Sequence, residues 1–164
     1  MSKLLLLLRH AKSDWYSGAL NDHGRPLNER GRRDAPRIGS WIASSGYRPH
    51  RIFCSDAQRT RETLELVMSV PDWGRHHPEV AYSHQLYMAS TKRVLDIIEA
   101  NWTDSGTLMV VGHNPTMDQI LVHYCPEARS NQSGKLMTTA TVAVIATANA
   151  ENSRLLHLIR PADL

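Results

Sequence analysis

The stretch that decides the fold is Leu4-Leu5-Leu6-Leu7-Leu8-Arg9-His10, in which five leucines end abruptly in two polar side chains. A continuous apolar run of this length is typical of a strand buried on both faces, as in a parallel sheet. It is too short to span a membrane and short for a signal-peptide core, and no small-residue cleavage site follows it. We therefore expect a cytoplasmic protein that has no targeting segment and no membrane partner.

Outward from this run, segments typical of strands and helices alternate along the chain. Further strands are expected at 51–54, 80–83, 107–111, 139–147 and 155–159, and helices at 29–45, from 55, at 91–101 and from 115. Alternating strands and helices predict an α/β fold. We expect one domain over residues 1–164, built as a three-layer sandwich with a mostly parallel central sheet flanked by helices.

Capping residues predict where the helices begin. Asn28 is a suitable N-cap for the helix at 29–45, and Pro36 inside that helix is expected to kink or weaken it. Residues 55–58 have the spacing of a capping box, with Ser first and Gln last. Asn114-Pro115 matches an N-cap followed by proline at the first helical position.

The composition is that of a soluble globular protein. Of 164 residues, 41% are hydrophobic and 21% charged, which excludes a disordered or collagen-like chain. The two cysteines, Cys54 and Cys125, are too few for a disulfide scaffold and favour a reducing compartment. The net charge is +3, and 15 of the 19 basic residues are arginine. Because a guanidinium group grips phosphate in a fork, this bias favours a partner that carries phosphate.

Three segments share one design, in which a buried strand ends in a polar cluster. Arg9 and His10 follow the first strand, Arg59 lies shortly after the second, and His113 follows the strand at 107–111. In an open α/β sheet the carboxyl ends of parallel strands form the ligand crevice. If these strands are neighbours, two arginines, two histidines and two helix N-termini converge on a site for an anion.

These residue types suit phosphoryl transfer. A neutral imidazole can attack phosphorus and form a covalent phosphohistidine, while the arginines neutralise the phosphoryl oxygens and a protonated second histidine donates to one of them. We expect no metal and no cofactor, because these cations supply the positive charge. The other seven histidines, His23 and His84 among them, show no metal-ligand spacing. Lys12, Ser13 and Asn114 could line the pocket, although a loop or capping role explains them equally well.

Four blocks of the sequence resemble the motifs of the histidine phosphatase superfamily, which includes the cofactor-dependent phosphoglycerate mutases. The resemblance covers about residues 4–120, and the length and motif variants look most like the small SixA-type phosphohistidine phosphatases. The four blocks are Leu7-Leu8-Arg9-His10-Ala11-Lys12-Ser13-Asp14-Trp15, Gly24-Arg25-Pro26-Leu27-Asn28-Glu29-Arg30-Gly31, Ser55-Asp56-Ala57-Gln58-Arg59-Thr60-Arg61-Glu62-Thr63 and Val110-Val111-Gly112-His113-Asn114-Pro115.

The resemblance implies a phosphoglycerate mutase-like fold and assigns roles to four residues. His10 would be the nucleophile, and Arg9, Arg59 and His113 would complete the phosphate pocket. Helical phase alone does not choose between Arg59 and Arg61, and only the resemblance selects Arg59.

The chain departs from the family pattern in two places. Ala11 stands where many members have glycine, which is a mild change. More important, the region 85–90 lacks the glutamate that acts as general acid in many members. An alkoxide leaving group usually needs such an acid, whereas an imidazole leaving group needs less help. We therefore expect a P–N substrate to be favoured over an alkyl phosphate, with Asp14 or Asp22 as possible replacement acids.

Together these features predict a metal-independent phosphatase that works through a phosphohistidine on His10 and acts on phosphohistidine in proteins. A phosphomonoesterase acting on a small metabolite or a phosphoprotein is the enzymatic alternative. The non-enzymatic alternative is a phosphate- or nucleic-acid-binding module, but no stretch interleaves aromatic with basic residues and no nucleic-acid-binding motif is present. We expect no nucleic-acid partner and a monomer.

Overall fold

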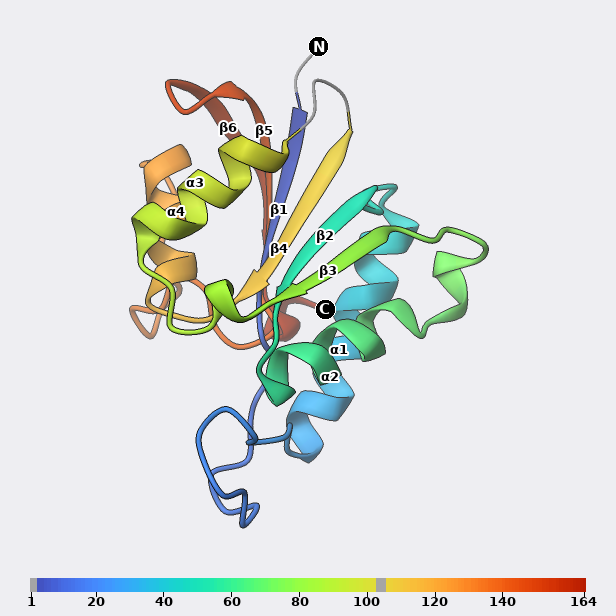
Figure 1. The fold of residues 1–164 in the computed structure, drawn as a ribbon. Coiled ribbons are helices and arrows are strands. Elements are labelled where there is room, and N and C mark those ends of the chain that lie inside the picture. Colours follow the sequence, from blue (N-terminus) through green and yellow to red (C-terminus); the bar gives the residue numbers. More distant parts are fainter. Residues whose placement is uncertain (1–2, 103–105) are drawn as a thin grey trace.

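The computed structural model describes residues 3–102 and 106–164, in which six strands form one sheet (Figure 1). The strand order is β3-β2-β4-β1-β5-β6. All neighbouring pairs among the first four strands are parallel, and β5 is antiparallel to both of its neighbours. The mostly parallel sheet is therefore confirmed. The strands are β1 (Lys3–Arg9), β2 (Arg51–Ser55), β3 (Glu79–Ser83), β4 (Thr107–Gly112), β5 (Val142–Asn149) and β6 (Asn152–Ile159).

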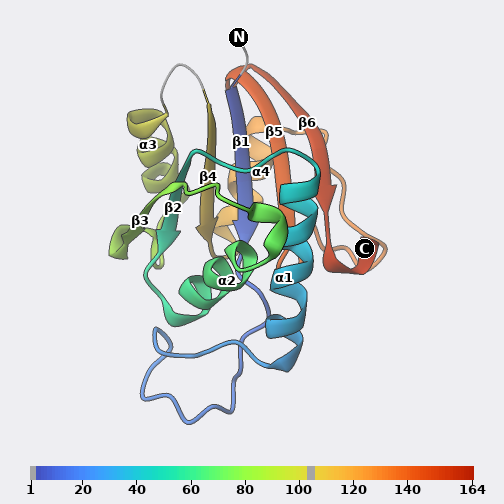
Figure 2. The ribbon, with the colours of Figure 1, turned by 90° about the vertical axis from the view of Figure 1, so that its right-hand side faces the viewer.

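Within the described residues, four α-helices cover the two faces of this sheet (Figures 1 and 2). Helices α1 (Glu29–Ser44) and α2 (Gln58–Met68) lie on one face, and α3 (Thr91–Asn101) and α4 (Thr116–Tyr124) lie on the other. Short 3₁₀ turns are η1 (Pro71–Trp73), η2 (His84–Leu86) and η3 (Pro161–Asp163). The arrangement is the predicted three-layer sandwich.

Alternating leucines of β1 supply both hydrophobic cores. Leu6 and Leu8 pack on the side of α1 and α2, whereas Leu5 and Leu7 pack on the side of α3 and α4. All four side chains are fully buried. The leucine run is continuous rather than alternating because each face of the central strand is covered by helices.

Two of the predicted helix starts are wrong. The N-cap of α2 is Ala57, without a side-chain cap, because Ser55 is still part of β2 and its hydroxyl lies beside His113. Helix α4 begins at Thr116 with Pro115 as its N-cap. The Asn28 cap is confirmed, since its side chain accepts from the Gly31 amide, and α1 continues through Pro36.

The strand expected at 139–147 begins later, at Val142. Residues 138–141 form a turn instead, in which the Thr141 amide donates to the Thr138 carbonyl. Ala140 has a φ of 59° and donates its amide to the carbonyl of His10. The turn therefore supports the end of β1, where the polar cluster begins.

A long loop, residues 10–28, leaves the end of β1 and projects beyond the sheet before entering α1 (Figures 1 and 2). Its return is fixed at Gly31, where an added Cβ would lie 2.2 Å from the Lys12 carbonyl oxygen. Only glycine permits this close approach between α1 and the loop. Across the two described segments, no helix combines the length and apolar character needed to cross a membrane.

Candidate active site

The parallel strands β1 and β4 bring the first and third polar clusters together. Their register pairs Arg9 with Gly112, so that the next residues, His10 and His113, lie side by side beyond the strand ends. The two imidazole rings are 5.3 Å apart between centroids. Arg59 joins them from the first turn of α2, because β2 is the other neighbour of β4.

His10 is held by its backbone and by its own ring. Its amide donates to the Gly112 carbonyl, and its carbonyl accepts from the Ala140 amide. Its Nδ1 lies 2.7 Å from the Ala11 carbonyl oxygen, which can only accept, so Nδ1 carries the proton of the neutral ring. That tautomer leaves an unshared electron pair on Nε2. The side chain is nine-tenths buried, with 8% of the residue exposed.

His113 is oriented by Ser55, a residue that the sequence analysis treated only as a helix cap. His113 Nε2 lies 2.8 Å from Ser55 Oγ. The same oxygen accepts from the Ala57 amide, and among the described residues its hydroxyl has no other acceptor than His113. Ser55 therefore donates to Nε2, which places the proton of neutral His113 on Nδ1. This Nδ1 is buried without a partner in the described part of the chain.

Both histidines are neutral near pH 7 in this substrate-free state. Burial, followed by the positive charges around it, lowers the pKa of His10 to about 3. Burial and the nearby Arg59 guanidinium lower the pKa of His113 to about 4. A neutral His10 has the free electron pair that a nucleophile needs. The sequence analysis expected a protonated His113, but before an anion binds this histidine is neutral.

The two arginines of the site are held in different ways. Arg9 Nη1 donates at 2.8 Å to the carbonyl of Met137, which lies in the segment between α4 and β5. Arg59 instead contacts the long loop, donating to the Asp22 carbonyl at 2.9 Å and to its carboxylate at 3.1 Å. Arg61 points elsewhere, since its Nε donates to the Asp56 carbonyl. Arg59 therefore lines the same cavity as the two histidines, and Arg61 does not.

These side chains line one cavity of about 310 Å³. Lys12, Ser13 and Asn114 also line it, so the structure places all three expected substrate-binding residues there. The Ser13 hydroxyl accepts a hydrogen bond from Arg25 Nη1, and this contact joins two parts of the loop that borders the cavity. Asn114 donates to the Met137 carbonyl and also accepts from the Asp118 amide, so it both borders the cavity and supports the start of α4.

Several buried donors at this cavity have no partner within the described residues. They are Arg9 Nε, Arg59 Nε, His113 Nδ1 and the Thr139 hydroxyl. Buried polar groups are nearly always hydrogen-bonded, and an unpaired one costs free energy. A cluster of unpaired donors lined by guanidinium groups is therefore a site built to receive an anion with several oxygens.

A second cavity of about 340 Å³ adjoins the first and shares Arg59, His113 and Asn114 with it. Its other lining is mainly apolar and includes Leu86, Met88 and Met117. The Tyr87 ring stands at the boundary, 5.7 Å from the His113 ring. This cavity offers space for an apolar or aromatic group attached to the anion.

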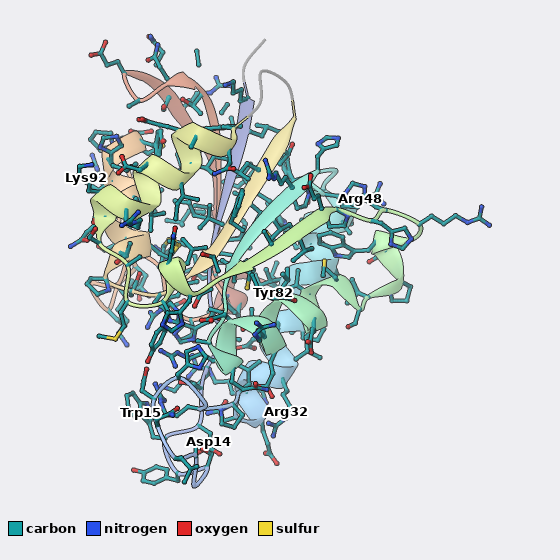
Figure 3. The ribbon with its side chains drawn as sticks, viewed as in Figure 1. Asp14, Trp15, Arg32, Arg48, Tyr82 and Lys92 are labelled. Atoms are coloured by element: carbon teal, nitrogen blue, oxygen red, sulfur yellow. The ribbon has the colours of Figure 1, made fainter. Side chains whose placement is uncertain are left out.

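The two candidate acids occupy different positions. Asp14 accepts from the Tyr16 amide in the exposed loop, where Figure 3 shows it with Trp15 beyond the sheet. Asp22 lines the anion cavity. A 2.6 Å hydrogen bond from Tyr87, together with Arg59 and Arg25, lowers the pKa of Asp22 to about 2. Asp22 is thus a carboxylate in this state, without a proton to donate.

Sequence reasoning missed three residues that organise the site. Ser55 orients His113, and Tyr87 holds Asp22. Thr63 accepts from the Ala11 amide and donates to the Arg59 carbonyl, so one hydroxyl joins the nucleophile segment to α2. Ser55 and Thr63 lie at the two ends of the block 55–63, which was the available signal. No sequence pattern singled out Tyr87.

The chain is similar in sequence to proteins of one family. Residues 5–77 match the family profile of the histidine phosphatase superfamily (branch 1). An uncharacterised chloroplastic protein of Arabidopsis thaliana is 37% identical over 120 residues, which cover 70% of this chain and 55% of the relative. The match thus spans little more than half of that relative's length. An uncharacterised protein of Mycobacterium tuberculosis is 35% identical over 115 residues, covering 70% of this chain and 68% of the relative.

Solved structures show the same likeness over nearly the whole chain. A crystal structure from Agrobacterium tumefaciens, assigned as the phosphohistidine phosphatase SixA, superposes with a TM-score of 0.82 at 29% identity. The alignment covers 98% of this chain and 99% of that one.

Proposed function

Because the chain belongs to the histidine phosphatase superfamily and resembles its SixA-type members, we propose that it is a metal-independent phosphatase that uses His10 as nucleophile. The observation that carries this proposal is the pair of neutral imidazoles, 5.3 Å apart, at a cavity lined by two guanidinium groups. The family supports phosphatase activity, and the mechanism and substrate below are the finer parts of the proposal.

In the first step, the electron pair on His10 Nε2 attacks the phosphorus atom, and the bond from phosphorus to the leaving group breaks. The leaving group takes the bonding electrons. Arg9 and Arg59 neutralise the phosphoryl oxygens, which is the largest contribution expected in this chemistry. His113 donates its Nδ1 proton in a hydrogen bond to one of these oxygens. Binding of a dianion raises the pKa of His113 and favours its imidazolium form.

In the second step, water attacks the phosphorylated His10 and releases inorganic phosphate. The phosphorylated ring keeps its Nδ1 proton, which the Ala11 carbonyl accepts at 2.7 Å. When the P–N bond breaks, the ring therefore leaves as neutral imidazole. The proton of the attacking water departs with the phosphate product.

The same reasoning favours a phosphohistidine substrate in a protein. Of the residues that line the anion cavity, the only carboxylate is Asp22, and it is ionised and bound to Arg59. An alkoxide leaving group lacks its proton donor here, whereas a ring nitrogen protonated at its far atom does not need one. The adjoining apolar cavity gives the leaving imidazole and its neighbouring side chains a place beside His113.

The decisive experiment is to trap the intermediate. Wild-type protein and His10→Ala are incubated with a phosphohistidine peptide in EDTA, quenched, and analysed by intact mass and peptide mapping. We expect acid-labile, base-stable phosphate on His10 in wild type and none in the variant. Turnover that requires a metal, or phosphate on another residue, would contradict the mechanism. Phosphate binding without any turnover would instead support a binding module.

A second comparison separates the substrate classes. The rate for the phosphohistidine peptide is compared with the rate for p-nitrophenyl phosphate and for an alkyl phosphate. We expect the alkyl phosphate to be the poorest substrate because it alone has a strongly basic leaving group. Equal turnover of the alkyl phosphate and the peptide would favour the phosphomonoesterase alternative.

A further inference from the structure

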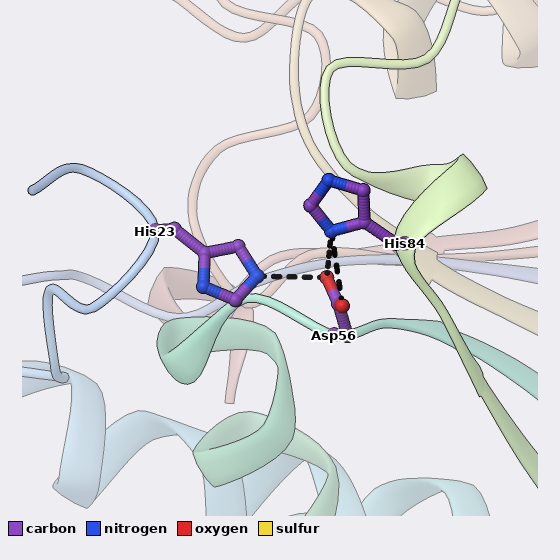
Figure 4. Close-up of side chains that lie close together, drawn as sticks. All are labelled: His23, Asp56 and His84. Atoms are coloured by element: carbon purple, nitrogen blue, oxygen red, sulfur yellow. Dashed lines mark hydrogen bonds and ion pairs between the residues drawn. The ribbon is translucent and has the colours of Figure 1, made fainter.

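Three side chains that are far apart in the sequence lie close together, as Figure 4 shows, and one of them is the neighbour of Asp22, which lines the anion cavity. His23 comes from the long loop, Asp56 from the junction of β2 and α2, and His84 from η2 after β3. One ligand atom of each lies within 4.8 Å of those of the other two. His23 Nε2 is 2.8 Å from Asp56 Oδ1, and His84 Nδ1 is 3.0 Å from Asp56 Oδ2.

We propose that His23, Asp56 and His84 bind one divalent transition-metal ion of the Zn²⁺ type, and that this ion lowers the affinity of the phosphate pocket. Two imidazole nitrogens and one carboxylate oxygen form a donor set that Zn²⁺ commonly takes, with water in the open position. The site lies outside the reaction centre and supplies no group to the proposed chemistry. It is a site for a regulator rather than for a resident cofactor.

The spacing of the donor atoms fits such an ion. With bonds of about 2.0–2.2 Å, tetrahedral ligand atoms lie about 3.4 Å apart. Measured to the one oxygen Oδ1, the His23 and His84 nitrogens lie 2.8 and 3.2 Å away, and these distances would lengthen by about 0.2–0.6 Å to admit the ion. Small side-chain rotations suffice, because His84 is largely exposed, with 74% of its side chain accessible.

The backbone already holds the three ligand segments together. The His23 carbonyl accepts from the Gln58 amide at 2.9 Å, and the Asp56 amide donates to the Ser83 carbonyl at 3.3 Å. These bonds position the residues before any ion arrives, so little ordering entropy opposes binding. The His23 ring also packs edge-on against Tyr87, with centroids 4.8 Å apart.

The expected effect on the phosphate pocket follows from the chain next to His23. Asp22 is its neighbour, and both the carboxylate and the carbonyl of Asp22 accept from Arg59. Tyr87 holds the same carboxylate at 2.6 Å. A metal ion that fixes His23 therefore keeps Asp22 on Arg59, and an incoming phosphoryl group must compete with it. This second part rests on Arg59 being part of the phosphate site, as the proposed function has it.

The ion is tested first by direct binding. Zn²⁺ is titrated in competition with a chromophoric chelator, using wild type, His84→Ala and, as a matched control, His123→Ala, which removes an exposed histidine of α4. We expect one ion per chain in wild type and in the control, and affinity at least about tenfold weaker in His84→Ala. Co²⁺ should give the visible absorption of a tetrahedral site in wild type and in His123→Ala but not in His84→Ala. Equal affinity in wild type and His84→Ala would overturn the site.

The consequence for phosphate is tested without relying on turnover. Binding of phenylphosphonate, which cannot be hydrolysed, is measured by calorimetry with and without one equivalent of Zn²⁺. We expect Zn²⁺ to weaken binding several-fold in wild type and in His123→Ala but not in His84→Ala. Zn²⁺ that binds without changing phosphonate affinity would overturn the regulatory part. Failure of the proposed phosphatase activity would leave both measurements interpretable.

Discussion

Two sides of the phosphate cavity are built on different principles. The floor consists of Arg9, His10 and His113, which follow or end the central strands. Backbone pairing with the sheet holds Arg9 and His10, and the Ser55 hydroxyl at the end of β2 holds the His113 ring. The wall consists of Trp15, Asp22 and Arg25 in the long loop, joined mainly by charged and stacking contacts between side chains.

The difference indicates how the two sides divide their tasks. Backbone ladders within a buried sheet open only with global unfolding, whereas exposed ion pairs contribute about 0–1 kcal/mol and are easily exchanged. Asp22 is half exposed, and the ring of Trp15 lies 3.5 Å from the Arg25 guanidinium with 66% of the residue exposed. The floor is thus suited to chemistry, and the wall to admitting and holding the substrate.

The largest effect should come from the floor. In His113→Ala we expect kcat to fall by about 10²–10³-fold, because a preorganised donor to the phosphoryl oxygens is lost. Steady-state kinetics with the phosphohistidine peptide measure this, with His123→Ala as the control that should match wild type. If only KM changed, His113 would contribute to holding the substrate, as the wall does, and not to the chemical step.

A smaller effect on the same donor should follow from Ser55→Ala. The variant removes the hydrogen bond that keeps the His113 proton on Nδ1, and one such bond is worth up to about 1.5 kcal/mol, or roughly tenfold in kcat. The ¹⁵N chemical shifts of the His113 ring should show a mixture of tautomers. Unchanged ring shifts would mean that Ser55 does not set the tautomer.

The floor should also make folding sensitive to acid. The pKa values of His10 and His113 are lowered in the folded protein, so between about pH 6.5 and these values the unfolded chain binds more protons. Stability is therefore fully present above about pH 6.5 and declines as the pH falls. Between pH 7 and 5, urea unfolding of His113→Ala should lose about 1–2 kcal/mol less than wild type. If wild type and His113→Ala lost the same free energy of unfolding over this pH range, the pKa of His113 would not be lowered in the folded protein.

The smallest effect should come from the wall. In Asp22→Asn, Arg59 loses its competing carboxylate, so we expect phenylphosphonate to bind about two- to fivefold more tightly, the range of an exposed ion pair. Calorimetry in metal-free buffer measures it, with Asp14→Asn as the matched loop control. Loss of peptide turnover in Asp22→Asn would show instead that Asp22 donates a proton during the reaction.

Much of the floor could be predicted from the sequence, because the leucine run and the motif blocks fix both the strands and the residues that follow them. The residues of the wall appear in the sequence analysis, with Trp15 and Arg25 in motif blocks and Asp22 as a candidate acid, but their contacts could not be predicted. Asp22 contacts Tyr87 and Arg59, which are distant along the chain, and no periodicity connects them. The Ser55 cap was mispredicted for the same reason. The local spacing suited a helix start, but the Ser55 hydroxyl is hydrogen-bonded to His113, which lies 58 positions away.

The exposed rim around the cavities has a consequence for how such a protein can diversify. Trp15 and Met88, which line the two cavities, are largely solvent-exposed, at 66% and 83%, and substitutions there cost the fold little. Related proteins could therefore acquire new substrates through substitutions of these exposed residues, while His10 keeps its place at the end of the buried leucine strand.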